Sequence, residues 1–578
     1  MHILDFSIIF ANMEKRWRIK EQADAEMIKN LSETLNVNSI VANILAQRGI
    51  TNFDLAKKFF RPSLSDLHNP FLMKDMDKAV ERIKRAIANK ENVLVYGDYD
   101  VDGTSAVALV YEFLKKIYDK VDYYIPDRYK EGYGISTAGI DFAESNNFSL
   151  IIALDCGIKA NAKIAYANKK KIDFIICDHH LPDEKIPEAV AVLDPKRKDC
   201  NYPYKELSGC GLGFKLVQGF AEKNNISFEE LEQYLDLVVI SIASDIVPII
   251  GENRLLAYFG LRQINSSPRQ GIKTLLELNN VKRELNITDL VFIIGPRINA
   301  AGRIDSGKKS VELLISSNVE IARQASEEIN KHNTDRRELD TDITAHALQM
   351  LDESPELQKR KTTVVFHSEW HKGVVGIVAS RLTEKYYRPT IVLAQSNGMI
   401  SGSARSVKDF DVYEAINACS DLLEQFGGHK YAAGLSLKPE NLKPFIEKFE
   451  KVVSETIEEY MLTPEVEIDA EINFTDINPK MLSILKQLAP FGPGNMAPVF
   501  ITKNVRDKGW TKIVGNNHLK MDLFQNENPS NSFSSIAFGQ GEKFALLSKK
   551  IPFSVCYVIE ENEFNGKTSL QLNVKDVK

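Results

Sequence analysis

The sequence predicts a multidomain α/β protein with a parallel-sheet domain, a long connecting helix, a smaller α/β domain and a C-terminal all-β barrel. Three observations support this prediction. Apolar runs alternate with helical patterns from about residue 73 to 194, residues 308–354 contain no glycine or proline, and the last 115 or so residues change to short alternating strands. A chain of 578 residues, 44% of them hydrophobic, is too long for one core and suits three or four domains.

Residues 1–72 are expected to be an N-terminal segment that packs on the domain after it. The start of the chain has no basic segment, and its apolar run 6–11 is short and lacks a small-residue cleavage site. No run approaches the roughly 20 apolar residues of a membrane span. The six cysteines include no CxxC pair, which argues against disulfides and a zinc ribbon. We expect a cytoplasmic protein with no membrane partner.

The first α/β domain is expected over residues 73–306. Its predicted strands are 93–96, 121–125, 150–154, 174–177 and 189–193, and its predicted helices include 104–117 and 160–168. This alternation favours a parallel sheet wrapped by helices. Ligands of such sheets bind at the carboxyl ends of the strands.

Acidic and histidine residues follow the apolar runs of this domain. They are Asp98, Asp100 and Asp102 after 93–95, Asp155 after 150–152, Asp178, His179 and His180 after 174–176, and Asp245 after 238–240. In an extended segment the first three would share one face, where they repel unless cations lie among them. Thr104 or Ser105 could cap the following helix. A solvated acidic turn is the alternative, and Asp155 or Asp245 alone would be an ordinary end of a strand or helix.

This set of side chains favours a particular metal chemistry. It offers oxygen ligands with one or two nitrogens and no thiolate, which suits Mn²⁺ or Mg²⁺ better than structural zinc. Two such ions about 3.5–4 Å apart can generate a hydroxide and hold both the attacked phosphate and its leaving oxygen. The predicted chemistry is therefore phosphoester hydrolysis.

Local charge is more informative than the formal net charge of −6, because bound metal would neutralise clustered aspartates. Residues 254–309 hold ten Lys or Arg against four Asp or Glu. This surplus predicts a groove that follows a phosphate backbone, with a solvated basic face as the alternative.

The rest of the chain divides into three parts. Residues 307–358 predict a long connecting helix with room for one break near His332 and Asn333. Residues 359–463 return to α/β character, with strands at 363–366 and 390–394. Residues 464–578 predict strands at 466–474, 499–505, 519–524 and 535–538 and a final hairpin turning at 565–566, which suggests an OB-type barrel.

Four motifs resemble those of the DHH phosphoesterases: GDYDVDGTSA, ALDCGI, CDHH and SIASDIVP. Further motifs resemble the RecJ family of bacterial single-strand-specific 5′→3′ exonucleases within that class. These are GPRINAAGRID, WHKGVVGIVASRL, SGSARS, FGGHKYAAGL and LAPFGPGN. The resemblance covers nearly all of the chain after about residue 40. It implies a DHH domain, a connecting helix, a DHHA1 domain and an OB-fold nucleic-acid-binding domain.

The resemblance also implies site residues. Metal ligands would be Asp100, Asp102, Asp155, His179 and Asp245. The catalytic set would be His180, which contacts the scissile phosphate, with Asp98 and Asp178 beside it; Asp98 could also be a ligand. Related enzymes often have a histidine where this chain has Tyr96, so no ligand is assigned there.

Substrate contacts implied by the resemblance lie further along the chain. They are Ser401, Ser403 and Arg405 at a 5′-phosphate, Gly428 and His429 across a cleft from the metals, and Arg303 on the DNA backbone. For His367 and His371 we favour packing or substrate contact over metal binding. For Trp510 we favour core packing over base stacking.

The leading hypothesis is a processive exonuclease that releases 5′-mononucleotides from single-stranded DNA in repair and recombination, using two Mn²⁺ or Mg²⁺ ions. The expected partners are DNA with a free 5′ end, a helicase and a single-strand-binding protein, and the expected state is a monomer. The alternatives are a DHH phosphodiesterase for oligoribonucleotides or cyclic dinucleotides and a non-catalytic DHH-fold scaffold.

Overall fold

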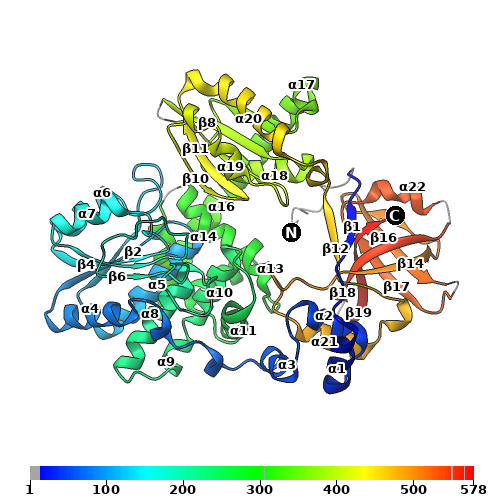
Figure 1. Cartoon of the computed structure of the whole chain (residues 1–578), viewed down its shortest axis with the longest axis horizontal. Coiled ribbons are helices and arrows are strands. Elements are labelled where there is room, and N and C mark those ends of the chain that lie inside the picture. Colours follow the sequence, from blue (N-terminus) through cyan, green and yellow to red (C-terminus); the bar gives the residue numbers. More distant parts are fainter. Residues whose placement is uncertain (1–12, 305, 397, 527, 549–550, 565–566) are drawn as a thin grey trace. The chain divides into compact units, whose positions relative to one another are not determined.

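The computed structural model describes residues 13–578 except 305, 397, 527, 549–550 and 565–566 (Figure 1). The chain forms two compact units. The middle unit contains Lys57–Arg336 and the nine residues Leu488–Met496. The flanking unit contains Arg337–Gln487, Ala497–Lys578 and the described residues up to Ala56.

The middle unit is built on a five-stranded parallel sheet, as the sequence predicts. The strand order is β3 (Val121–Tyr124), β2 (Asn92–Gly97), β4 (Phe148–Leu154), β5 (Asp173–Cys177) and β6 (Ala191–Leu193). The strands read as continuous apolar runs because helices cover both faces. One face packs against α5 (Val101–Ile117) and α8 (Gly209–Lys223), and the other against α6 (Thr137–Ser145) and α7 (Asn161–Lys169).

Helices complete the middle unit. They are α3 (Phe53–Phe60, shared with the flanking unit), α4 (Met76–Ala88), α9 (Glu229–Glu232), α10 (Leu235–Ser244), α11 (Gly251–Ser266), α12 (Gln270–Leu278), α13 (Ile287–Asp289), α14 (Gly295–Ile304) and α15 (Lys308–Ile315). The run 238–240 before Asp245, which the sequence left open as strand or helix, lies inside α10. This helix is buried all round, so its apolar run carries no helical period that distinguishes it from a buried strand.

The long connecting helix is α16 (Val319–Asp352), 34 residues in length. The helix has no break near His332 and Asn333, where the sequence left room for one, because α16 passes through both positions. The interruption lies earlier, at residues 316–318, where the Asn318 side chain accepts hydrogen bonds from the N–H groups of Glu320 and Ile321. This cap starts a new helix after α15.

The first part of the flanking unit is a mixed five-stranded sheet. Its order is β10 (Gln425–His429), β11 (Ala432–Leu437), β9 (Met399–Arg405), β8 (Thr390–Ser396) and β7 (Thr363–His367), with only β7 and β8 parallel. Apolar clusters lie on both faces, one including α19 (Val412–Asn417) and α20 (Leu442–Thr456) and the other α18 (Val375–Tyr386). The short helix α17 (Pro355–Lys359) precedes β7.

The C-terminal part is a curled seven-stranded sheet. Its order is β13 (Ala470–Glu471), β14 (Phe500–Asp507), β18 (Phe553–Phe564), β19 (Lys567–Val577), β17 (Ser532–Ala537), β16 (His518–Gln525) and β15 (Lys512–Val514). The sheet closes on itself because β14 also pairs with β16. The expected final hairpin is β18–β19, and its turn at 565–566 lies outside the described residues. The single strand expected at 466–474 is wrong: Asn473 and Asp476 cap a 3₁₀ turn there after β13.

An N-terminal strand joins the flanking unit. Strand β1 (Arg16–Ile19) pairs in parallel with β12 (Glu465–Ile468), and α1 (Ala25–Leu35), α2 (Ser39–Gln47) and α21 (Pro479–Gln487) lie in the same unit. All six cysteines are buried and free. None of the helices in the described part of the chain combines the length and apolar character that crossing a bilayer demands.

Candidate metal centre

The carboxyl ends of three neighbouring strands bring the motif residues together. Gly97, Leu154 and Cys177 are in register at the ends of β2, β4 and β5. The residues that follow them are Asp98, Asp155 and Asp178, all buried. The strand ends therefore align three carboxyl groups along one edge of the sheet, as the sequence predicts.

Asp100 and Asp102 reach the same edge by a route that the sequence reading did not foresee. Strand β2 ends at Gly97, so strand alternation does not align them. Asp100 is the N-cap of α5 and accepts the N–H of Gly103 at 3.0 Å, whereas Thr104 and Ser105, the expected caps, lie inside the helix. A Cβ on Gly103 would lie 2.5 Å from the Asp98 carbonyl oxygen, so only glycine fits this turn.

His179 lies at the middle of the cluster. Its Nε2 is 3.1 Å from Asp155 Oδ1, 3.6 Å from Asp245 Oδ2 and 3.8 Å from Asp102 Oδ2. Two sets could each hold an ion: Asp102 with His179 and Asp245, and Asp155 with His179 and His180. Burial lowers the pKa of His179, which leaves the imidazole neutral with a lone pair to donate.

The electrostatics of the cluster fit divalent cations. Burial, followed by the charges of neighbouring aspartates, raises the pKa of Asp155 and Asp245 well above the ordinary value. Burial and Asp100 do the same for Asp98, and burial and Asp102 raise the pKa of Asp100. Among the described residues, three buried atoms here lack hydrogen-bond partners: Asp98 Oδ2, Asp155 Oδ1 and His179 Nδ1. Cations would relieve the repulsion and engage hard oxygen donors of this kind.

His180 differs from His179 because a buried carboxylate holds its ring. His180 Nδ1 donates to Asp178 Oδ1 at 2.7 Å, and Ile158 N–H donates to Asp178 Oδ2 at 2.8 Å. Burial opposes the charge on His180, but the hydrogen bond and charge of Asp178 raise its pKa to about 9. Burial is likewise outweighed at Asp178, where His180 lowers the pKa to about 2. His180, with 46% of its side chain exposed, is therefore a cation near neutral pH that can meet an anionic group.

Tyr133 is a site residue that the sequence reading missed. Its hydroxyl donates to the Asp155 carbonyl oxygen at 3.2 Å and lies 3.3 Å from His180 Nε2, while the residue is 55% exposed. Gly132 and Gly134 on either side have φ of 84° and 80°, which a Gly-Tyr-Gly sequence could have signalled. Tyr96, at the position without a ligand assignment, donates to the Gly134 carbonyl oxygen and so holds this loop.

Asp245 ends α10 and is followed by a strained residue. Ile246 has φ of 58°, an unfavourable conformation for a β-branched side chain, and is 61% exposed. The turn after it is held by Leu488–Met496: Ile249 N–H donates to the Pro493 carbonyl oxygen at 2.7 Å, and Arg254 donates to that of Ala489 at 2.9 Å. This segment thus buttresses the turn that follows Asp245.

The other candidate residues form a second group in the flanking unit. Ser401, Ser403 and Arg405 lie on β9, and Gly428 and His429 on β10. Arg405 and His429 both lie opposite Ala432 of β11, which separates the two strands. Arg405 donates to Ser403 Oγ at 2.7 Å and to Ser380 Oγ, in the middle of α18, at 3.2 Å.

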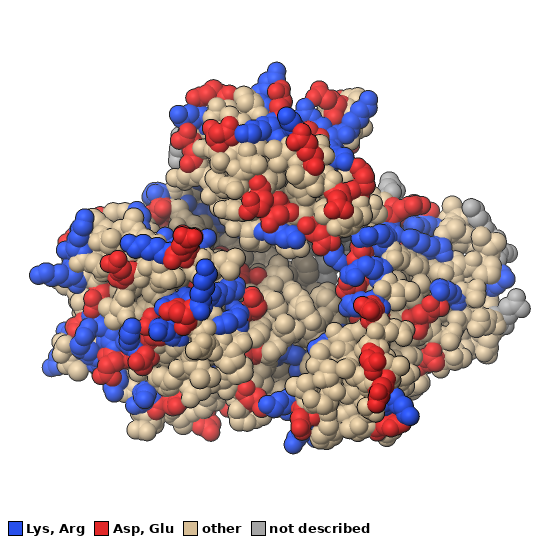
Figure 2. Space-filling model, in the orientation of Figure 1, with Lys and Arg blue, Asp and Glu red and all other residues tan. Residues whose placement is uncertain are grey.

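Arg303 belongs to α14 of the middle unit, and its carbonyl oxygen accepts a hydrogen bond from Tyr129. The basic groove expected at 254–309 stays a prediction, but four of the arginines of this segment bond within the protein. They are Arg254, Arg269, Arg283 and Arg297. Figure 2 likewise shows Lys and Arg mixed with Asp and Glu over the visible face of the middle unit.

Two aromatic expectations have different outcomes. His367 packs against His346 and Trp370, with ring centroids 4.8 and 5.7 Å apart, in agreement with packing. The core packing expected for Trp510 is wrong, since this residue is 73% exposed. Exposure leaves base stacking as the remaining interpretation of Trp510.

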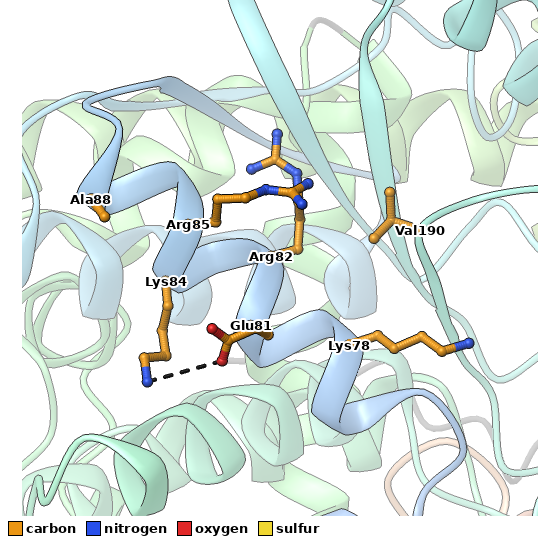
Figure 3. A pocket seen from close by; sticks show the side chains of 7 residues that line it. All are labelled: Lys78, Glu81, Arg82, Lys84, Arg85, Ala88 and Val190. Carbon is orange, nitrogen blue, oxygen red and sulfur yellow. Dashed lines mark ion pairs between the residues drawn. The ribbon is translucent and has the colours of Figure 1, made fainter.

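An open pocket of about 570 Å³ lies away from the metal centre, against α4 (Figure 3). Its walls include Lys78, Lys84 and Arg85. Arg82, also in the lining, donates to Asp173 at the start of β5, so the pocket lies toward the opposite edge of the sheet. All four cations of its lining have carboxylate partners, so we assign it no ligand.

Comparison with known proteins agrees with this fold and site. Three family models match: the N-terminal domain of the DHH family at residues 92–242, the DHHA1 domain at 359–455 and the RecJ OB domain at 468–576. A parallel sheet whose strand ends carry these acids and the Asp-His-His triplet is thus the catalytic module of a DHH-family protein.

Similarity to individual proteins shows which family within the DHH class this chain resembles. The chain is 35% identical over 568 residues to the single-stranded-DNA-specific exonuclease RecJ of Bacillus subtilis, covering 97% of this chain and 70% of that protein. It is 32% identical over 524 residues to RecJ of Salmonella typhimurium, covering 87% and 90%. The crystal structure of Thermus thermophilus RecJ with Mn²⁺ matches with a TM-score of 0.83 at 25% identity, covering 97% of this chain and 79% of that one. The chain belongs to the RecJ family.

Proposed function

We propose that this protein is a 5′→3′ exonuclease specific for single-stranded DNA, which hydrolyses phosphodiester bonds with two Mn²⁺ or Mg²⁺ ions and releases 5′-mononucleotides. The observation that carries the proposal is the convergence of mutually repelling carboxylates, buried at Asp102 and Asp155 and partly exposed at Asp245, around the neutral imidazole of His179. Relatives named single-stranded-DNA-specific exonucleases, and RecJ structures with Mn²⁺ and with Mg²⁺, support it.

The ions would be held by side chains of this centre, with Asp98 as either a further ligand or a hydrogen-bonding neighbour. The five ligands are Asp100, Asp102, Asp155, His179 and Asp245. When bound, such ions supply a hydroxide nucleophile at neutral pH and charge stabilisation for the phosphate.

The protein's own groups would position the scissile phosphate. His180, kept protonated by Asp178, would donate a hydrogen bond and a positive charge to a phosphate oxygen as negative charge develops there. Because Asp178 also accepts the N–H groups of Ile158 and His180, the imidazolium has a fixed direction. The Tyr133 hydroxyl, near His180 Nε2, restricts the same ring from its other side.

The 5′ end of the strand would be recognised by the group in the flanking unit. Ser401, Ser403 and Arg405 offer hydroxyl and guanidinium donors, which suit a terminal phosphate. A Cβ on Gly376 would lie 3.0 Å from Arg405 Nη2, so glycine there leaves space beside the guanidinium. At Gly428 a Cβ would lie 2.6 Å from Ala433 Cα, so only glycine lets β10 and β11 approach; His429 is exposed beside it. Arg303 would contact the DNA backbone.

The chain would divide by function into an N-terminal segment (1–72), a DHH catalytic domain (73–306), a connecting helix (307–358), a DHHA1 domain (359–463) and an OB-fold domain (464–578). The exposed Trp510 of the OB-fold would stack on a base of the single strand. We expect a cytoplasmic monomer that acts in DNA repair and recombination, fed by a helicase and a single-strand-binding protein.

The test is release of mononucleotides from internally labelled single-stranded DNA with Mn²⁺, comparing a blocked 5′ end with a blocked 3′ end. Release that only the 5′ block stops, and that Asp102→Ala abolishes, is the expected result. DNA binding without release from either substrate would favour a scaffold. Release from short oligoribonucleotides or cyclic dinucleotides alone would favour the other DHH activity.

A further inference from the structure

Asp102 differs from the other acids of the centre in how completely the protein itself engages it. Its Oδ2 accepts the N–H of Gly209 at 2.7 Å, and its Oδ1 accepts the N–H of Cys210 at 2.7 Å and the Ser241 hydroxyl at 2.8 Å. Three donors from two helices, α8 and α10, therefore fix both oxygens.

The Ser241 hydroxyl also contacts a second serine. Gly211 N–H donates to Ser208 Oγ at 3.1 Å, and Ser241 Oγ donates to Ser208 Oγ at 2.6 Å. Asp102 Oδ1 and Ser208 Oγ are therefore the two acceptors of the Ser241 proton, and the carboxylate is the stronger of them. All three serine and aspartate side chains are buried, so water does not compete for these bonds.

The same two helix segments also contact other acids of the centre. The Ser241 carbonyl oxygen accepts the N–H of Asp245 at 2.9 Å, one turn further along α10. On α8, a Cβ on Gly209 would lie 2.7 Å from Asp155 Oδ1, so glycine lets this carboxylate pack against the first turn. Ser241 and its neighbours thus touch Asp102, Asp155 and Asp245 together.

We propose that Ser241 is a positioning residue of the metal centre, which holds the Asp102 carboxylate in its orientation before any ion binds and so sets the affinity for divalent cations. This inference rests on the proposed function only in taking Asp102 as a ligand. The hydroxyl acts through Asp102 and does not touch the substrate. Loss of such a contact behind a ligand typically weakens metal binding by about 10–100-fold.

The test is calorimetric titration of the full-length, metal-stripped protein with Mn²⁺, without DNA. Ser241→Ala should weaken Mn²⁺ binding by about 10–100-fold. Excess Mn²⁺ should restore nucleotide release in Ser241→Ala but not in Asp102→Ala. Ser208→Ala keeps the Ser241 hydroxyl but removes the cap that holds the first turn of α8, whose N–H groups donate to Asp102. It should give a smaller loss of affinity in the same direction, and it serves as the second variant if Ser241→Ala does not fold.

Ser310→Ala is the matched control, since this buried serine donates one hydrogen bond, to the Ile298 carbonyl oxygen at 2.8 Å. It should lower thermal stability about as much as Ser241→Ala and leave the Mn²⁺ dissociation constant unchanged. Mn²⁺ affinities of Ser241→Ala and Ser208→Ala that match the wild type would overturn the proposal. A wild-type protein that binds Mn²⁺ but releases no nucleotide would overturn the exonuclease instead, and the comparison of affinities would still decide the role of Ser241.

Discussion

Two clusters of carboxylates, one in each unit, show opposite electrostatics. In the metal centre of the middle unit, burial and neighbouring acids raise the pKa of Asp155. In the flanking unit, β1 and β12 form an ionic ladder in which Arg16 and Arg18 lie opposite Glu465 and Glu467. There burial is outweighed by hydrogen bonds from Lys408 and Arg18, which lower the pKa of Glu465.

The comparison shows how a cluster of acids that holds the fold together can be told from one that binds metal. Carboxylates that the chain supplies with its own cations hold segments together, and Glu465 does so for β1, β12 and Lys408. Carboxylates that are buried together without such cations reduce stability until a cation from outside arrives. The shared feature, a row of acids, does not distinguish the two; the sign of the pKa shift does.

The largest expected effect is that of Asp155→Asn in the metal centre. Nucleotide release should fall by about 10³-fold or more, because a metal ligand supplies several kcal/mol of transition-state stabilisation. The metal-free variant should nevertheless unfold at a higher temperature than metal-free wild type, since one repelling charge is gone. Activity assays and thermal unfolding in EDTA check both halves. A metal-free variant less stable than the metal-free wild type would contradict the claim that the clustered acids destabilise the empty centre.

The second prediction concerns the pH dependence of the metal-free protein. Asp98, Asp155 and Asp245 have raised pKa values in the folded state, so they bind protons more tightly when folded. Their contribution to stability is present at low pH and is lost as pH rises through those raised values. Glu465 has a lowered pKa, so its contribution is present above the unfolded value near 4.5 and is lost only as pH falls below it.

Over the pH range from the ordinary carboxyl value of 3.8 up to those raised values, metal-free protein should therefore unfold at progressively lower temperature. Saturating Mn²⁺ should remove this decline because the cations replace the bound protons. Thermal unfolding across this range, in EDTA and in Mn²⁺, is the measurement. An equal decline in both would show that the acids of the centre do not cause it.

A smaller effect is expected from Glu465→Gln in the ladder. The Glu465 side chain is only 3% exposed and pairs with three cations, so the free energy of unfolding should fall by about 1 kcal/mol. The loss should shrink at high salt, and nucleotide release should not change. Glu467→Gln, at a more exposed carboxylate, should lose less. A drop in nucleotide release for Glu465→Gln would contradict a purely structural ladder.

The smallest expected effect is at Ile246, whose positive φ places backbone strain beside Asp245. Ile246→Asn should raise the free energy of unfolding by up to about 1 kcal/mol, since asparagine tolerates this conformation better. Ile513→Asn, at an exposed isoleucine of β15 without positive φ, is the control and should bring no gain. Denaturant unfolding distinguishes them, and equal changes in both would exclude strain as the cause.

The sequence predicted the parallel sheet and its acids because buried strands read as apolar runs that end abruptly at Asp or His. It could not tell that 238–240 is helical, since α10 is buried all round. The sequence did not identify Tyr133 and Ser241 as site residues, because only folding brings them to the metal centre. Ser241, for example, lies 139 residues from Asp102. Charge counts along the basic segment have the same limit, since they do not show that Arg269 is paired with Asp236.

The nine residues Leu488–Met496 limit where this chain can be divided into parts that fold on their own. They lie more than 150 positions after Arg336 in the sequence, yet they fold with the middle unit and supply acceptors to Arg254 and Ile249. A gene truncated after the DHH motifs would encode all the acids of the centre but not this buttress. Its product would keep the ligands while losing support for the turn after Asp245. An exchange of this domain between proteins, in evolution or in the laboratory, must therefore transfer Lys57–Arg336 and Leu488–Met496 together.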